Sequence, residues 1–309
     1  MNNLSKIILL SLSALAASLK VSAQGDEALP FVAIDRNPVT SAMGGVSIAS
    51  SSVSPFSAFS NSALIPLSHK TADFAFSWQN WAPDGTKSTN FNLGGVYKIG
   101  KKIGLSVVGT YQSGDEYTVI DASGNAKDPF TPSDMVFGVG VGYNFFKGLS
   151  AGVNLKYASE KLSDEDTYSA FGADIFLAYR ISDFNLTAGV TSVGSSVKDY
   201  KGNSFSLPSS AKLGVGYDKV FSEKHLVEAG LEGDYYFSGN PAVALGAGYT
   251  FNEMLSVRAG YRYGGDSVIP SYASAGIGFS MFGVHIDLSY LFASEVLGNT
   301  MNIGLGWRF

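Results

Sequence analysis

Residues 149–157 read LSAGVNLKY, and this stretch decides the fold class. Every second residue from Leu149 to Tyr157 is apolar or aromatic, and the residues between them are small or polar. Successive side chains of a β-strand point to opposite faces, so the pattern predicts a strand with one apolar face. The same alternation recurs at 171–180 and at 301–309.

The composition favours a membrane protein that spans the bilayer with strands. The 309 residues include 36 glycines, 21 phenylalanines and 16 tyrosines, and 15% of the residues are charged. No run of 18 apolar residues follows Ala23, so no membrane-spanning helix is predicted. A closed barrel is the other structure that pairs every backbone polar group within lipid. The predicted fold class is therefore all-β, a transmembrane antiparallel up-and-down β-barrel, because alternating segments of about ten residues are its signature.

The alternating segments number fourteen, an even count as expected for a single-chain bacterial barrel. Connections after even-numbered segments are short, whereas those after odd-numbered segments are mostly long, as at 114–132 and 193–208. Outer-membrane barrels have short periplasmic turns and longer external loops. We therefore expect a barrel at 72–309 with both ends periplasmic, surrounded by the lipid of a Gram-negative outer membrane. The predicted strands are 72–81, 89–99, 102–113, 133–146, 148–159, 168–180, 183–192, 209–219, 223–237, 241–250, 253–263, 270–280, 282–292 and 299–309.

Tyrosines near the ends of the apolar faces favour a membrane barrel over a soluble β-sandwich, which would not need them. Aromatic girdles at both membrane interfaces are typical of transmembrane barrels. The chain also ends on an aromatic residue, Phe309, which resembles the signal that outer-membrane assembly machinery recognises. The tyrosines are Tyr97, Tyr111, Tyr143, Tyr157, Tyr179, Tyr217, Tyr249, Tyr261 and Tyr290.

The first 23 residues have the three parts of a secretory signal peptide. Lys6 precedes an apolar run at 7–17, and Val21-Ser22-Ala23 supplies a small-residue cleavage site. Cleavage leaves 19 basic and 26 acidic residues, a net charge of −7. Nucleic acid is not an expected partner, because its binding favours basic patches. The chain has no cysteine, so no disulfide is expected.

Residues 24–71 precede the first predicted strand and are apolar in patches. A barrel of fourteen strands lies between the size that side chains can fill and the size that leaves an aqueous channel. We therefore expect this segment to enter the barrel from the periplasmic side as a plug. The alternative is a disordered periplasmic tail, which would leave its large apolar residues exposed. The residues expected to form the plug are Met43, Gly44, Gly45, Phe56, Phe59 and Asn61.

Charged residues on inward faces predict a ladder of side chains along the lumen wall. Inward small residues at 244, 246 and 248 leave room for arginines to reach carboxylates across one strand, about 10 Å away. The ladder is either a selectivity or docking site, or a set of ion pairs that orders the wall. Its predicted members are Lys212, Glu228, Glu232, Asp234, Arg258, Arg262 and Asp287.

No catalytic residue and no metal site is predicted. His69, His225 and His285 fall on separate segments and lack the spacing of zinc ligands. The sequence contains no Gly-x-Ser-x-Gly motif and no cysteine nucleophile. The prediction is a non-enzyme without a cofactor.

The segment before the first strand also carries a family resemblance. LPF at 29–31, AMGGVSIA at 42–49 and FSAFSNSAL at 56–64 resemble the opening of the PorV/PorQ family. These are outer-membrane proteins of Bacteroidota related to the FadL long-chain fatty acid transporters. The resemblance implies a 14-stranded barrel with an N-terminal plug. Two departures are Ser62, where the family has proline, and Ser50 to Ser54, where it has an acidic patch.

The resemblance implies two classes of function. PorV-like members are adaptors in type IX secretion, and an accessory role in an outer-membrane assembly complex is related to it. FadL-like relatives take up hydrophobic small molecules, which leave sideways through a gap in the wall. The charged ladder and mostly small external loops weigh against the second class, whereas an adaptor needs large outer loops, of which the sequence offers 114–132 and 193–208. We expect protein partners of a secretion or assembly complex. Uptake of a hydrophobic ligand is the alternative.

Overall fold

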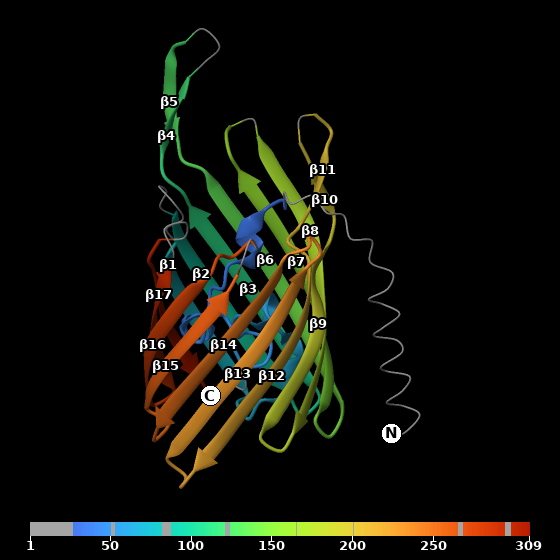
Figure 1. Cartoon of the computed structure of the whole chain (residues 1–309), viewed down its shortest axis with the longest axis vertical. Helices are drawn as coiled ribbons and strands as arrows, with labels where there is room; N and C mark the ends of the chain where they lie inside the picture. The colour runs from blue at the N-terminus through green and yellow to red at the C-terminus, as the bar shows by residue number, and fades with distance from the viewer. Residues whose placement is uncertain are drawn as a thin grey trace.

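The chain forms one closed β-barrel with a short segment inside it. The computed structural model describes residues 27–50, 53–81, 88–120, 124–164, 166–199, 201–264, 268–293 and 298–309. Fourteen strands pair antiparallel with their neighbours, and β1 closes the barrel against β18 (Figure 1). The predicted fold class is confirmed, and each predicted strand boundary lies within two residues of the observed one. The barrel strands are β1 (Ala72–Trp81), β2 (Ser88–Ile99), β3 (Ile103–Ser113), β6 (Ser133–Phe146), β7 (Leu149–Lys161), β8 (Thr167–Ile181), β9 (Phe184–Gly194), β12 (Ser210–Phe221), β13 (His225–Tyr236), β14 (Pro241–Phe251), β15 (Leu255–Tyr263), β16 (Tyr272–Met281), β17 (Val284–Ala293) and β18 (Thr300–Arg308).

The wall separates an apolar outer face from a small and polar inner face. Along β14, exposed and buried residues alternate, with Leu245 52% exposed and Ala244 fully buried. Seven of the nine predicted girdle tyrosines are exposed on the outer face: Tyr97, Tyr111, Tyr143, Tyr157, Tyr179, Tyr249 and Tyr261. The period of two in the sequence thus sets which side chains meet lipid and which meet the lumen. None of the described helices is long and apolar enough to span a membrane.

The two ends of the barrel differ. At one end, here called the turn end, the strands connect tightly, and the backbone N–H groups of Thr71 and Ala72 donate to the carbonyl of Phe309. The opposite end, called the long-loop end, carries two hairpins outside the barrel sheet. Strands β4 (Tyr117–Ile120) and β5 (Ala126–Phe130) form the first hairpin, which projects well beyond the barrel (Figure 1). Strands β10 (Ser196–Lys198) and β11 (Ser204–Ser206) form the second. The sequence predicted both segments as loops.

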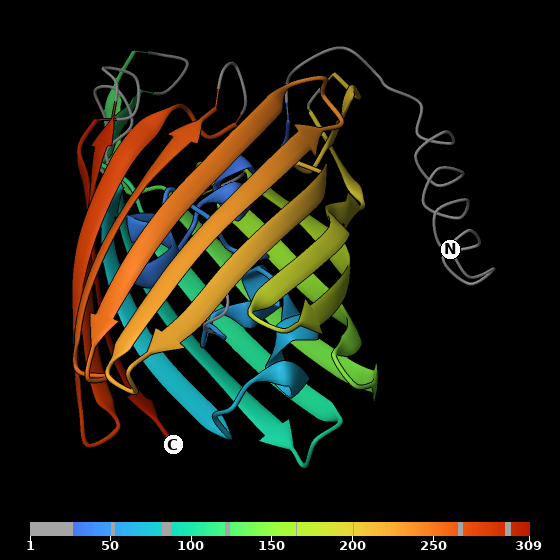
Figure 2. The ribbon, with the colours of Figure 1, turned by 60° about the horizontal axis from the view of Figure 1, so that its bottom comes forward.

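The segment 27–71 is called the hatch, and its described residues up to 68 lie inside the barrel (Figure 2), whereas 69–71 are exposed. The helical elements of the hatch are the 3₁₀ turns η1 (Pro30–Ala33), η2 (Ser57–Phe59) and η3 (Ser62–Leu67) and the short helix α2 (Pro38–Ala42). The hatch begins at the long-loop end, where the N–H of Ala28 donates to the carbonyl of Ser206 at 2.8 Å. It runs through the lumen to the turn end, where β1 begins. We expected the hatch to enter the barrel at the end where β1 begins and β18 ends, and this expectation is wrong. The apolar residues at the start of the hatch explain the difference, because they pack within the barrel at the long-loop end.

Candidate functional site

The lumen is filled by two parts of the hatch that lie on opposite walls. Residues 35–50, called the first leaf, contain α2, which packs against β15 to β18. Residues 53–71, called the second leaf, contain η2 and η3, which pack against β2, β3, β6, β7 and β8. The helical elements of the two leaves therefore lie against different parts of the wall, and the leaves meet at Ile48, which packs with Leu64 and with Phe176 of β8.

Glycines in the wall let the leaves approach its backbone. A Cβ atom on Gly246 or Gly260 would lie 2.4 Å or closer to backbone atoms of the first leaf at Met43 and Gly44. Gly44 and Gly45 have φ of +72° and +84°, in the left-handed region that glycine adopts without strain. The glycine pair thus serves a close turn against β14 and β15.

The second leaf meets the opposite wall in the same way. A Cβ atom on Gly152 would lie 2.4 Å from the backbone nitrogen of Ala63, and one on Gly104 would lie 2.4 Å from Cβ of Ile65. The inward small residues were predicted to leave room for arginines. The hatch fills part of that room, with Met43 beside Gly246, and an arginine fills another part, with Arg258 beside Gly248.

One carboxylate ties the first leaf to the wall. Oε2 of Glu232 accepts hydrogen bonds from the backbone N–H groups of Ser47 at 2.7 Å and Ile48 at 3.0 Å. Nζ of Lys212 lies 3.1 Å from the other carboxylate oxygen. The Glu232 side chain is fully buried, so these charge-assisted hydrogen bonds replace those that water would make to an exposed carboxylate.

The predicted ladder residues fall into two groups. The upper group joins Lys212 to Glu232 and Asp234, and the guanidinium of Arg262 reaches across β14 to Asp234 at 2.9 Å. Arg262 also donates to the hydroxyl of Tyr236 at 3.3 Å. This group lies beside the first leaf, in the middle of the lumen.

The lower group lies toward the turn end. The guanidinium of Arg258 reaches across β16 to Asp287 at 2.9 Å, and Glu228 lies beside the same arginine around Gly248. His285 joins Asp287 to Asp73, with 3.0 Å to each carboxylate. Nε of Arg308 lies 2.7 Å from the second oxygen of Asp73. The group thus crosses the seam between β18 and β1.

Sequence reasoning missed Asp73, His285 and Arg308, which belong to the lower group. It also missed Lys156 and Asp174, a buried ion pair of 2.7 Å beside the second leaf. Inward positions on the predicted strands would have identified all five. Their partners depend on the pairing register, such as Asp73 opposite Arg308 where the barrel closes.

The predicted plug residues all lie in the lumen. Met43, Phe56 and Asn61 are at most 3% exposed. The N–H of Gly44 donates to the hydroxyl of Ser274 at 3.0 Å, and the guanidinium carbon of Arg36 lies 4.9 Å from the ring centre of Phe59. Burial raises the pKa of Asp35 and lowers the pKa of Arg36 to about 10.

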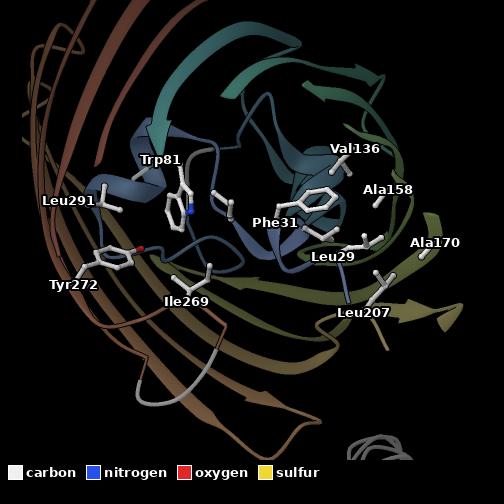
Figure 3. Packing of buried hydrophobic residues seen from close by; sticks show 12 residues of the cluster. Leu29, Phe31, Trp81, Val136, Ala158, Ala170, Leu207, Ile269, Tyr272 and Leu291 are labelled. Carbon is white, nitrogen blue, oxygen red and sulfur yellow. The ribbon is translucent and has the colours of Figure 1, made fainter. Parts of the chain in front are cut away.

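An apolar layer closes the lumen at the long-loop end (Figure 3). The hatch contributes the residues around η1, and the remaining residues come from the wall and the adjoining loops. Figure 3 shows Phe31 and Leu29 beside Val136 and Ala158, with Tyr272 and Leu291 on the other side of the lumen. The layer consists of Leu29, Phe31, Val32, Ile34, Trp81, Val136, Ala158, Ala170, Leu207, Ile269, Tyr272 and Leu291.

Two cavities lie below this layer. A central cavity of about 90 Å³ is lined by both leaves, by Trp81 and Leu291 of the apolar layer, and by Arg262 of the upper group. A smaller cavity of about 20 Å³ lies nearer the turn end, beside His285 and Arg308 of the lower group. A buried water needs about 10–15 Å³ by the same measure, so the central cavity has room for several waters. Among the described residues, no group of histidine, aspartate and glutamate side chains could hold a metal ion.

No family model matches the chain, and no curated protein matches it in sequence. Solved structures match its fold. The toluene transporter TodX of Pseudomonas putida aligns over 88% of this chain and 97% of its own, with 15% identity and a TM-score of 0.62. The toluene transporter TbuX of Ralstonia pickettii aligns over 88% and 98%, with 14% identity and a TM-score of 0.60. A FadL homologue of Pseudomonas aeruginosa aligns over 89% and 99%, with 11% identity and a TM-score of 0.52.

These neighbours are two toluene transporters and a FadL homologue, and their match shows that the predicted barrel is a known fold. The narrower resemblance to PorV/PorQ proteins has no counterpart among them and stays a prediction. The chain has the fold of the FadL-like outer-membrane channels, a closed 14-stranded antiparallel barrel.

Proposed function

We propose that the chain is a non-enzymatic outer-membrane channel that admits small, largely apolar molecules into its lumen. The long-loop end faces outward, and the turn end, where β1 begins and β18 ends, faces the periplasm. The apolar layer carries this proposal. It offers a ligand twelve apolar or aromatic side chains at the end that a molecule from outside meets first. Binding there buries apolar surface, which contributes about 25 cal/mol per Å².

The similarity to hydrocarbon channels supports this assignment over the adaptor role expected from the sequence. On the sequence alone the ladder weighs against uptake, because uptake of a hydrophobic molecule favours an apolar path through the lumen. In the structure its carboxylates and cations are paired with each other and with the hatch. A ligand in the apolar layer does not need to displace them.

Two substitutions on the same face of β17 test the proposal. Leu291→Asn places an amide in the apolar layer, whereas Ser289→Asn places it two residues lower, in the polar part of the lumen. Burying an unpaired amide costs about 1–3 kcal/mol, so Leu291→Asn should slow uptake of radiolabelled toluene by roughly tenfold. Ser289→Asn should take up toluene at nearly the native rate. Equal rates in all three proteins would contradict the proposal, provided that heat-dependent gel mobility shows each barrel folded.

The adaptor role is the second candidate, and the β4–β5 hairpin is the observation that favours it. The hairpin projects beyond the barrel, with Tyr117 43% and Ile120 67% exposed. A projecting ribbon with free strand edges is a usual place for another protein to add a strand. The test of this candidate is the hairpin deletion described in the Discussion.

A further inference from the structure

The two leaves are held more firmly by their walls than by each other. Charge-assisted bonds from Glu232 fix the first leaf, and the guanidinium of Arg180 fixes the second by donating to the carbonyl of Leu67 at 2.9 Å. Charge-assisted bonds are roughly twice as strong as neutral ones.

The hydrogen bonds between the leaves are neutral. Nδ2 of Asn37 donates to Oγ of Ser54 at 3.0 Å, and Nδ2 of Asn61 donates to the carbonyl of Ile48 at 3.0 Å. Asn37 belongs to the first leaf and Ser54 to the second.

The leaves also meet through the cation–π contact of Arg36 with Phe59 and through the packing of Ile48 on Ala63 and Leu64. The charge-assisted hydrogen bonds of Glu232 and Arg180 each join a leaf to the wall, so the leaf-to-wall surfaces are the stronger ones in polar contacts.

The Asn37–Ser54 contact also lies between the two cavities. The central cavity and the smaller cavity share three lining residues, Asn37, Ser54 and Phe56. Above this contact lies the space that borders the apolar layer, and below it lies the space beside His285 and Arg308 near the turn end. Separation of Asn37 from Ser54 would join the two spaces.

We propose that the Asn37–Ser54 contact is the constriction of the transport path, which opens when the leaves separate there while each stays on its own wall. The proposal rests on the proposed transport function and adds the route within the lumen. Phe56, which lines both cavities, is the side chain that a ligand passes after the contact opens. The tie between Asn61 and Ile48 lies on the side of the central cavity and outside the smaller one, and it keeps the leaves joined when Asn37 and Ser54 separate.

The chain has no cysteine, so pairs of introduced thiols can be linked without background. Asn37→Cys with Ser54→Cys allows the two leaves to be linked by a short, reducible bifunctional thiol reagent. Val46→Cys with Gly230→Cys links the first leaf to β13 instead. The Cβ atoms of this control pair would lie 3.5 Å apart, within the range of disulfides. Each protein is compared with itself before linking, after linking and after reduction.

Uptake of radiolabelled toluene is the readout. Linking the leaves should lower the rate by at least about tenfold, as expected when a gating motion is blocked, and reduction should restore it. Linking the first leaf to β13 should leave the rate within about twofold of the unlinked value. Loss of uptake in the leaf-to-wall pair would overturn the proposal, because the hatch would then move as one body. Unchanged uptake in both pairs would also overturn it, because the path would not pass between the leaves.

Two single substitutions test the contact without a link. Ser54→Ala removes the oxygen that accepts from Asn37 of the first leaf and from the N–H of Phe56, whereas Ser57→Ala removes a buried hydroxyl that donates to the carbonyl of Ser54 within the second leaf. Ser54→Ala should raise the potassium chloride conductance in planar bilayers several-fold, and Ser57→Ala should not. The reverse order would contradict the proposal. Absence of toluene uptake by the native chain would instead overturn the proposed function. This outcome is distinct from every linking result, because each linking result is measured against uptake by the unlinked protein.

Discussion

Single residues decide how closely the hatch and the wall approach. At Gly44 a Cβ atom would lie 2.7 Å from the backbone oxygens of Leu245 and Tyr261, and the φ of +72° is one that other residues rarely adopt. At Glu232 the side chain bonds a neighbouring wall lysine and two N–H groups of the hatch. Gly44 thus permits the close contact between hatch and wall, and Glu232 stabilises it.

Gly44→Ala should therefore loosen the first leaf. Left-handed backbone and overpacking each cost about 1–3 kcal/mol at such a position. We expect faster trypsin cleavage after Arg36, which is 3% exposed in the native hatch. Gly233→Ala is the matched control, because nothing lies within 4 Å of its Cβ position. Equal cleavage rates in the two variants would contradict this role of Gly44.

Glu232→Ala should destabilise the whole protein more than any change in an exposed ion pair. It leaves Lys212 without one of its two carboxylates and two hatch N–H groups without an acceptor, and breaking a buried pair costs about 3–5 kcal/mol. The comparison is Asp164→Ala, which removes the exposed pair with Lys161 and should cost about 1 kcal/mol or less. Urea unfolding in detergent micelles measures both free energies of unfolding. A smaller loss in Glu232→Ala than in Asp164→Ala would show that the carboxylate does not hold the hatch.

At the scale of elements, barrel strands and loop hairpins differ in how clearly the sequence shows them. Each barrel strand has about ten alternating residues, so the period of two is unmistakable. Strand β10 has three residues and β4 has four, which is too short for alternation to stand out. Both hairpins pair outside the barrel sheet, so the wall does not impose its pattern on them.

Replacing residues 115–131 by a short turn should leave the barrel folded. The hairpin contacts the end of β7 and the loop after it: the Tyr117 hydroxyl donates to the carbonyl of Leu162, and Nζ of Lys161 lies 5.2 Å from the ring centre of Phe130. Heat-dependent gel mobility should be native, and toluene uptake should stay within about twofold, because the apolar layer is untouched. A folded variant that keeps uptake and loses export of other proteins would support the adaptor role as well. A variant that does not fold would contradict the independence of the hairpin.

At the scale of the whole molecule, the sequence predicts the barrel better than its contents. The fourteen strands follow from local alternation, which one stretch such as 149–157 already displays. The ion pairs of Arg262 and Arg258 can also be predicted, because these side chains point inward on strands that pair with their neighbours in sequence. The entry side of the hatch does not, because nothing local to residues 27–34 indicates which rim of the barrel they reach. The Asp73–His285 contact depends on how the last strands meet the first, which is a property of closure.

Deleting residues 24–66 should leave the sheet closed and open a water-filled pore through the lumen. The hatch fills the lumen between walls that carry small inward residues, and fourteen strands alone leave space. Planar-bilayer recordings should show a large, steady conductance in the deletion and little in the native chain. Unchanged conductance would mean that the hatch does not close the lumen. Residues 67–71 are kept, because Thr71 bonds Phe309 at the closure of the barrel.

The two leaves of the hatch are attached to different parts of the barrel wall. A change in the cross-section of the barrel therefore changes the separation of the leaves. Widening of the barrel across β6 and β16 pulls the leaves apart, and narrowing presses them together. The surrounding bilayer, through the lateral force that it exerts on the barrel, therefore acts on the same contact that a permeating molecule must open.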